Sequence, residues 1–294
     1  MGIVQSDDRL QTIMEKLESI TNIPTIPLVA TRAMRSARDS GSSMRDIAEI
    51  ISTDPPLAAR VLKVVNSAYY GLRQSVGSLP LALTILGIRE IINLVMGLSL
   101  MTIFPDSTRG GLFNRNEFWK HSAATAQIGK MLTEKLGFSK LASEVFVGGL
   151  LHDIGKIIMD EHMHKEFCSA IELSVEEGLP LHDAESMLVG ATHPQIGAWL
   201  SKKWKLPENL VVAISHHHSP QKLFSDDVMK QIVYIANILC NAHDAGESSE
   251  SIVASLLKDP IWDICTGSSR REINVKKIVE GISEEIEKTS SLIS

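Results

Sequence analysis

Cysteine is scarce in this sequence. The three cysteines, Cys168, Cys240 and Cys265, stand far apart, and none of them belongs to a Cys-X-X-Cys pair. The first residues also lack the basic start and apolar core of a secretory leader. An odd number of isolated cysteines without such a leader predicts reduced thiols in a cytoplasmic protein.

The sequence also lacks an excess of positive charge and a long apolar run. It has 29 lysines and arginines against 35 aspartates and glutamates, so its formal net charge is −6. Broad nucleic-acid binding needs a dense basic surface, and this balance argues against it. The longest apolar run, residues 91–104, is interrupted by Asn93 and is too short to span a bilayer. We therefore expect a buried helix there and no membrane span.

Strand signals are missing as well, because no long alternation of apolar and polar residues occurs and no repeat recurs at a fixed period. Helical spacing is common instead, as in the stripe of Leu10, Ile13 and Met14. One later helix is expected over 141–151, running on past Lys156. The sequence therefore predicts an all-α protein, and its 294 residues suffice for one large core or two smaller ones.

Two polar segments divide the expected helices. Pro105–Asn114 has the glycines and polar residues of a linker, and Gly246–Glu250 is a second polar break. We expect three parts: an N-terminal helical subdomain over 1–110, a histidine-containing helical subdomain over 111–245 and a C-terminal helical extension over 246–294.

The clearest chemical signal is the run Gly148-Gly149-Leu150-Leu151-His152-Asp153-Ile154-Gly155-Lys156. His152 and Asp153 are two metal-ligand types on neighbouring residues. Apolar residues precede the pair, and Lys156 follows. Burying a carboxylate in such surroundings costs several kcal/mol unless a cation or hydrogen-bond donors compensate. The run therefore predicts a buried polar site within an apolar helical stretch.

Other histidines extend this signal over a long stretch of sequence. They include His121, His193 and the adjacent pair His217 and His218. Glu117 precedes His121 by four residues, so both side chains lie on one face of a helix. Two interpretations stay open for the set: a metal site, or a polar core held by internal hydrogen bonds. Glu117 alone also fits an ordinary acid in the first turn of a helix.

Together, these and further motifs resemble the HDOD family, a branch of the HD superfamily of metal-dependent phosphohydrolases. The resemblance covers roughly residues 20–245. Its motifs are Ile23-Pro24-Thr25-Ile26-Pro27, Val65-Asn66-Ser67-Ala68-Tyr69-Tyr70-Gly71, Leu83-Thr84-Ile85-Leu86-Gly87, the run from Gly149 to Lys156, Glu185, His193-Pro194-Gln195-Ile196-Gly197-Ala198, Trp204-Lys205-Leu206-Pro207 and His217-His218-Ser219-Pro220. It implies a multi-helical HD-like bundle preceded by an N-terminal helical subdomain, and a bacterial signalling role as an output or scaffold domain.

Similarity to the related HD-GYP phosphodiesterases implies a dinuclear metal centre. By that resemblance Asp153 bridges two cations, and histidines complete both sites. The histidines of the first site are His121 and His152, and those of the second are His193, His217 and His218. Glu117 matches a further ligand of the pattern. Lys156 matches a catalytic cation beside Asp153, although a lysine that extends to the surface has the same spacing.

The chain departs from this pattern in two places. The final aspartate of the superfamily falls on Asn237, whose amide oxygen is a neutral and weaker ligand. Asp244 follows two helical turns later and is a partial substitute. No Gly-Tyr-Pro follows His218, so the resemblance does not extend to hydrolysis of cyclic dinucleotides.

The expected ligands favour a transition metal and leave two main functions open. Imidazole-rich ligation favours Fe, Mn, Ni or Zn over Mg or Ca. The first function is a signalling or scaffold protein that binds signalling partners and keeps the metal for structure or sensing. The second is a metal-dependent phosphohydrolase, a phosphodiesterase or nucleotidase, in which two cations clamp a phosphoester and Lys156 stabilises its charge. A redox or oxygen sensor is a third interpretation. The family resemblance favours the first function, whereas ligand spacing alone favours the hydrolase.

Overall fold

The computed structural model describes residues 2–21, 23–39, 41–67, 70–104, 111–219, 227–267 and 273–293. Within these ranges the regular elements are all helices, which confirms the expected fold class. The first six are α1 (Gly2–Glu18), α2 (Leu28–Arg38), α3 (Met44–Ser52), α4 (Pro55–Val65), α5 (Leu79–Leu86) and α6 (Ile88–Ile103). Most of the expected linker, residues 105–110, lies outside the described residues.

The second half of the chain contains the elements that carry the expected site. They are α7 (Arg115–Lys135), the 3₁₀ helix η1 (Ser139–Leu141), α8 (Ala142–Leu151), α9 (Ile154–His162), α10 (His164–Glu177), α11 (Leu181–Leu188), α12 (His193–Lys203) and α13 (Glu208–His216). The last five are α14 (Val228–Asp244), α15 (Ser249–Leu256), α16 (Pro260–Thr266), α17 (Val275–Glu280) and α18 (Ile282–Ile293).

Capping interactions fix where several of these helices begin. At α3, the Ser43 hydroxyl accepts from the backbone N–H of Asp46, and the Asp46 carboxylate accepts from the backbone N–H of Ser43, which together form a capping box. At α12, the backbone N–H of Thr192 donates to the Gln195 side chain at 2.8 Å. This contact sets the start of α12, so that His193 is its first residue.

The helix expected to run from 141 past Lys156 is interrupted, so that expectation was wrong. α8 ends at Leu151, and α9 begins at Ile154 after a break in which Asp153 has φ −98° and ψ 6°. Apolar spacing predicted a continuous helix because the residues on both sides of the break are buried. The side chains of His152 and Asp153 instead make polar interactions. The Asp153 carboxylate contacts residues at the ends of other helices.

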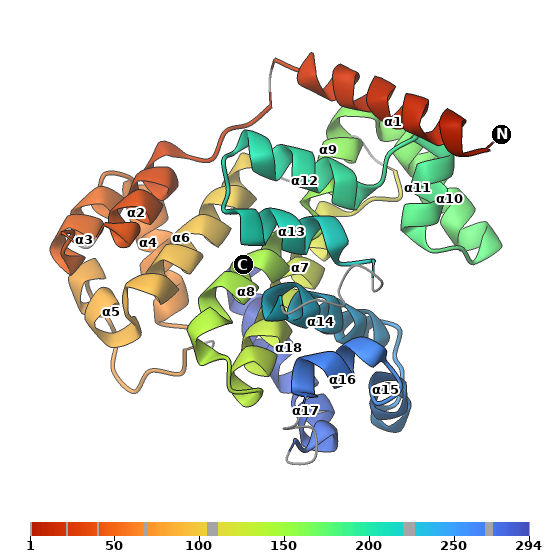
Figure 1. The fold of residues 1–294 in the computed structure, drawn as a ribbon. Helices are drawn as coiled ribbons and strands as arrows, with labels where there is room; N and C mark the ends of the chain where they lie inside the picture. The colour runs from red at the N-terminus through yellow and green to blue at the C-terminus, as the bar shows by residue number, and fades with distance from the viewer. Residues whose placement is uncertain are drawn as a thin grey trace.

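In the second half of the chain, α8, α14 and α18 pack against α7 (Figure 1). α12 packs against both α9 and α13, and α1 crosses the top of this group in the figure. Buried apolar side chains from Leu17 to Ile282 form one continuous core. This core includes residues from all three expected parts of the chain, and their division at 110 and 245 stays a prediction.

The bent pair of α5 and α6 bears on membrane insertion. Among the described residues, no single helix is both long and apolar enough to cross a bilayer. The pair is long and apolar enough only when its two helices are combined, and the chain bends by 119° between them. Ten consecutive residues of α6 are buried within the protein, as expected for residues 91–104.

A glycine contact brings α9 and α12 close together beside the expected site. A Cβ atom on Gly155 would lie 2.0 Å from the carbonyl oxygen of His193 and 2.8 Å from the backbone nitrogen of Gly197. Both neighbours are backbone atoms, so neither can move aside without shifting α12. Gly155 therefore permits the approach that places His193 next to Asp153.

We expect Gly155→Ala to destabilise the protein by about 3 kcal/mol, because the added methyl group forces α9 and α12 apart. The matched control is Gly77→Ala, where a Cβ atom meets nothing within 4 Å. Its free energy of unfolding should change by less than about 0.5 kcal/mol. Urea unfolding of the variants measures both, and equal midpoints would contradict the close contact.

Candidate metal centre

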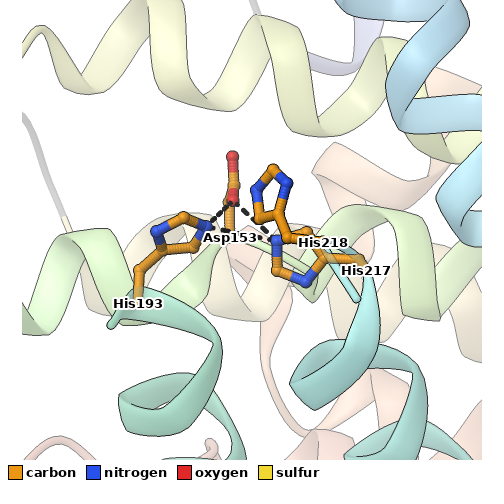
Figure 2. A group of neighbouring side chains, drawn as sticks. All are labelled: Asp153, His193, His217 and His218. Carbon is orange, nitrogen blue, oxygen red and sulfur yellow. Dashed lines mark hydrogen bonds and ion pairs between the residues drawn. The ribbon is translucent and has the colours of Figure 1, made fainter. Parts of the chain in front are cut away.

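The buried carboxylate of Asp153 is surrounded by nitrogen atoms. Its side chain is only 2% exposed. Oδ2 lies 2.6 Å from the Lys156 Nζ and 3.3 Å from the His152 Nε2. Oδ1 lies 3.1 Å from the His193 Nε2 and 3.3 Å from the His217 Nε2. Figure 2 shows the rings of His193 and His217 converging on the carboxylate from α12 and from the end of α13.

Helix ends orient two of these rings. His152 and His217 each follow the last residue of a helix, where backbone carbonyl groups lack partners within the helix. The His152 Nδ1 donates to the Gly149 carbonyl at 2.6 Å, and the His217 Nδ1 donates to the Ile214 carbonyl at 2.7 Å. A carbonyl oxygen can only accept, so the proton lies on Nδ1. The Nε2 lone pair of each neutral ring therefore faces Asp153.

Glu185 orients the third ring. It lies on α11, is fully buried, and accepts from the His193 Nδ1 at 2.7 Å and from the His193 backbone N–H at 2.8 Å. A carboxylate that accepts from a metal-ligating histidine is a frequent outer partner in metal sites. In the sequence Glu185 stands only as part of a family motif and has no assigned role, because nothing in the local pattern shows which side chain it meets.

Burial and charge set the protonation of these groups. Burial lowers the pKa of His217 to about 3, and it also lowers the pKa values of His152 and His218. Burial by itself would raise the pKa of Asp153, but His152 and Lys156 hold that pKa well below its ordinary value. Burial opposes protonation of His193 too, but the Glu185 charge outweighs it and raises the His193 pKa.

The residues present fit a divalent cation. The His193 and His217 Nε2 atoms lie only 3.2 Å apart. In addition, the His152 Nε2 and the Asp153 Oδ1 are buried without a well-oriented hydrogen bond. Nitrogen lone pairs thus surround one carboxylate, and few protons lie between them. A cation would compensate this concentration of negative charge. Asp153, His193, His217 and His218 form a group whose ligand atoms all lie within 4.8 Å of one another.

The structure also brings His121 and Asn237 together, at the edge of this cluster. The His121 Nε2 lies 3.1 Å from the Asn237 Oδ1 and 3.9 Å from the Asp153 Oδ2. His121, His152 and Asp153 form a second group with ligand spacing. Asp244 lies beside the His121 Nδ1 at 3.3 Å. Burial opposes protonation of His121, but hydrogen bonds to Asp244 and Cys240 raise its pKa to about 10.

Two expected site residues have simpler surroundings. The Glu117 side chain is 63% exposed and pairs with Lys120 at 2.7 Å. Among the described residues it belongs to none of the groups with ligand spacing. Lys156 pairs directly with Asp153, and its side chain is 19% exposed.

A cleft of about 910 Å³ lies beside Asp153. Its polar wall is formed by Glu117, Lys120, His121, Asp153, Lys156 and Asp244. Ile286 and Thr289 of α18 line it as well, a contribution from the C-terminal helix that the sequence did not reveal. His193, His217 and His218 do not line this cleft, so it meets the cluster at Asp153 and His121.

Comparisons with known proteins agree with the helical fold. The model of the HDOD domain matches residues 23–220, so this chain belongs to the HDOD family. A solved HDOD domain protein of unknown function from Geobacter sulfurreducens is 27% identical, with a TM-score of 0.82 and 97% of each chain covered. A putative phosphohydrolase from Shewanella amazonensis is 23% identical, covers 94% of this chain and 97% of its own, and shares the fold with a TM-score of 0.74.

The curated relatives are longer than the region they share with this chain. An uncharacterized protein of Treponema pallidum is 26% identical over 215 residues, which are 73% of this chain and 41% of that protein. The uncharacterized protein YuxH of Bacillus subtilis is 30% identical over 141 residues, which are 48% of this chain and 31% of that protein. The family and the His/Asp cluster together support a divalent metal.

We expect Glu185→Gln to weaken metal binding about 10-fold to 100-fold, because it removes the charge that orients and polarises His193. Competition with a chelator of known affinity measures this change. Glu176→Gln, on the exposed face of α10, is the matched control and should leave the affinity unchanged. Equal affinities for all three proteins would show that Glu185 does not support the centre.

Proposed function

We propose that this HDOD chain is a signalling or scaffold module in which one buried divalent transition metal joins α9, α12 and α13. The observation that carries this proposal is the group of Asp153, His193, His217 and His218. Its members come from the start of α9, the start of α12 and the end of α13. A metal held by all four would connect α9 to the later, consecutive helices α12 and α13.

The enclosure of this group supports a structural or sensing role. Asp153, His193 and His217 are each at most 2% exposed, and His218 is the partly buried member of the group. Structural metal sites are closed by four protein ligands, whereas catalytic sites keep an open position for water or substrate. Binding energy at a closed site is coupled to folding. Metal occupancy would therefore change the stability with which α12 and α13 pack against α9. We infer that signalling proteins bind the helical surface controlled in this way.

The runner-up function is a metal-dependent phosphohydrolase. The cleft favours it, because Asp153 and Lys156 lie in its wall. A bound divalent cation would supply Lewis acidity for cleavage of a phosphoester, and the Lys156 ammonium could pair with a phosphate oxygen. Two features weigh against it. Lys156 is already paired with Asp153 at 2.6 Å, and Asn237 supplies no charge at the open edge of the cluster. Two cations bridged by Asp153 stay a prediction.

We expect Asp153→Asn to abolish stabilisation by metal, because the only carboxylate of the four-residue group is lost. For the unaltered protein, metal at 100 times its dissociation constant should add about 2.7 kcal/mol to the free energy of unfolding. Thermal melting with and without Mn²⁺, a metal that thiolate ligands do not favour, together with the manganese content of the protein, gives the comparison. The exposed Asp183→Asn is the control. A variant that keeps both its metal and its stabilisation would refute a centre at Asp153.

Turnover separates the two functions. We expect the metal-loaded protein to hydrolyse nucleotides and model phosphodiesters no faster than Asp153→Asn does. The screen uses Fe²⁺, Mn²⁺, Ni²⁺ and Zn²⁺ in turn and detects released phosphate or phenolate. Robust hydrolysis that disappears in Asp153→Asn would reject the scaffold proposal and establish the phosphohydrolase.

A further inference from the structure

Three potential ligands meet on the side of His121 that faces away from Asp153. The His121 Nδ1 lies 3.3 Å from the Asp244 Oδ2 and 3.4 Å from the Cys240 Sγ. Cys240 and Asp244 are 3.8 Å apart between the same sulfur and oxygen atoms. They are separated by one turn of α14, so both side chains face α7 from one side of the helix.

The three distances match those between the ligands of a tetrahedral cation. Zinc bonds of about 2.3 Å to sulfur and about 2.0–2.1 Å to nitrogen and oxygen fix the spacing of the ligand atoms. At tetrahedral angles, nitrogen and sulfur are then about 3.5 Å apart, nitrogen and oxygen about 3.4 Å, and sulfur and oxygen about 3.6 Å. The corresponding distances here are 3.4, 3.3 and 3.8 Å. No large movement is needed to bind such a cation.

Asn237 sets His121 in the orientation that this site needs. Its Oδ1 accepts from the Asn241 side chain at 3.1 Å and faces the His121 Nε2 at the same distance. The Asn237 Oδ1 accepts a hydrogen bond from the Nε2–H of His121. A cation that displaces the proton from the other ring nitrogen, Nδ1, would therefore bind there, beside Cys240 and Asp244. The replacement of an aspartate by Asn237 thus favours ligation on the far side of the ring.

We propose that the Nδ1 of His121, the thiolate of Cys240 and the carboxylate of Asp244 form a separate site for a thiophilic divalent cation such as zinc. Thiolate ligation favours zinc over magnesium or calcium, and binding releases the thiol proton. The Asp244 side chain is 52% exposed, and both it and His121 line the cleft. A fourth position therefore opens toward water or a ligand in that cleft. The site does not depend on whether the Asp153 centre is filled.

Cobalt(II) tests this site directly, because only a thiolate ligand gives a sulfur-to-cobalt charge-transfer band in the near ultraviolet. We expect the full-length protein, stripped of metal, to develop this band on titration with Co²⁺. The band should persist in Asp153→Asn, which disables the first centre, and disappear in Cys240→Ser. Cys168→Ser is the matched control and should keep the band, although Cys168 also lies near a histidine, at 3.7 Å from His164.

A second variant guards against misfolding of the buried Cys240 position. Asp244→Asn alters an exposed side chain, and we expect it to weaken the Co²⁺ affinity of the thiolate site by at least about 10-fold. Absence of the band from the unaltered protein would overturn the proposal. So would its persistence in Cys240→Ser, its loss in Cys168→Ser, or an unchanged affinity in Asp244→Asn. Loss of the band in Asp153→Asn would also overturn the proposal, because the thiolate site would then depend on the first centre.

Discussion

The interaction on which this structure depends is the compensation of one buried carboxylate. Removing the Asp153 charge from water costs several kcal/mol, and the protein must return that free energy through nearby cations or donors. His152 provides one partner from the neighbouring residue, and Lys156 provides another from the next turn of the chain. The others come from α12 and α13, so the polar requirement of a single residue fixes how these helices meet α9. Gly155 makes this arrangement sterically feasible, because any side chain there would overlap the backbone of α12.

Orientation of the rings follows from the ends of helices. His152 and His217 use the same local device, in which the residue after a helix bonds the carbonyl three residues before it. His193 reaches the same result with the Glu185 carboxylate. In all three cases Nδ1 is occupied by an acceptor outside the cluster, and Nε2 is directed inward. The cluster is therefore arranged for a cation before any cation arrives, which lowers the conformational cost of binding.

His121 stands between two groups of ligands, and Asn237 decides between them. An aspartate at this position would add a charge to the Asp153 cluster. Asn237 instead offers a neutral acceptor to Nε2, while Cys240 and Asp244 gather around Nδ1. The buried group around His217 and the cleft-facing group around His121 consequently have different exposure and different ligand chemistry. This division supports a binding or sensing module more than a symmetric dinuclear hydrolase.

The sequence by itself determined the helical class, the HDOD membership and the identity of the histidines that surround Asp153. Helical spacing and the adjacent pair of His152 and Asp153 are local properties, so they can be identified directly from the sequence. The tertiary structure alone decided the break at Asp153, the contact of Glu185 with His193 and the meeting of His121 with Cys240. These depend on helix packing across distances of 8 to 119 residues in sequence, and no spacing rule reports which faces of distant helices come together.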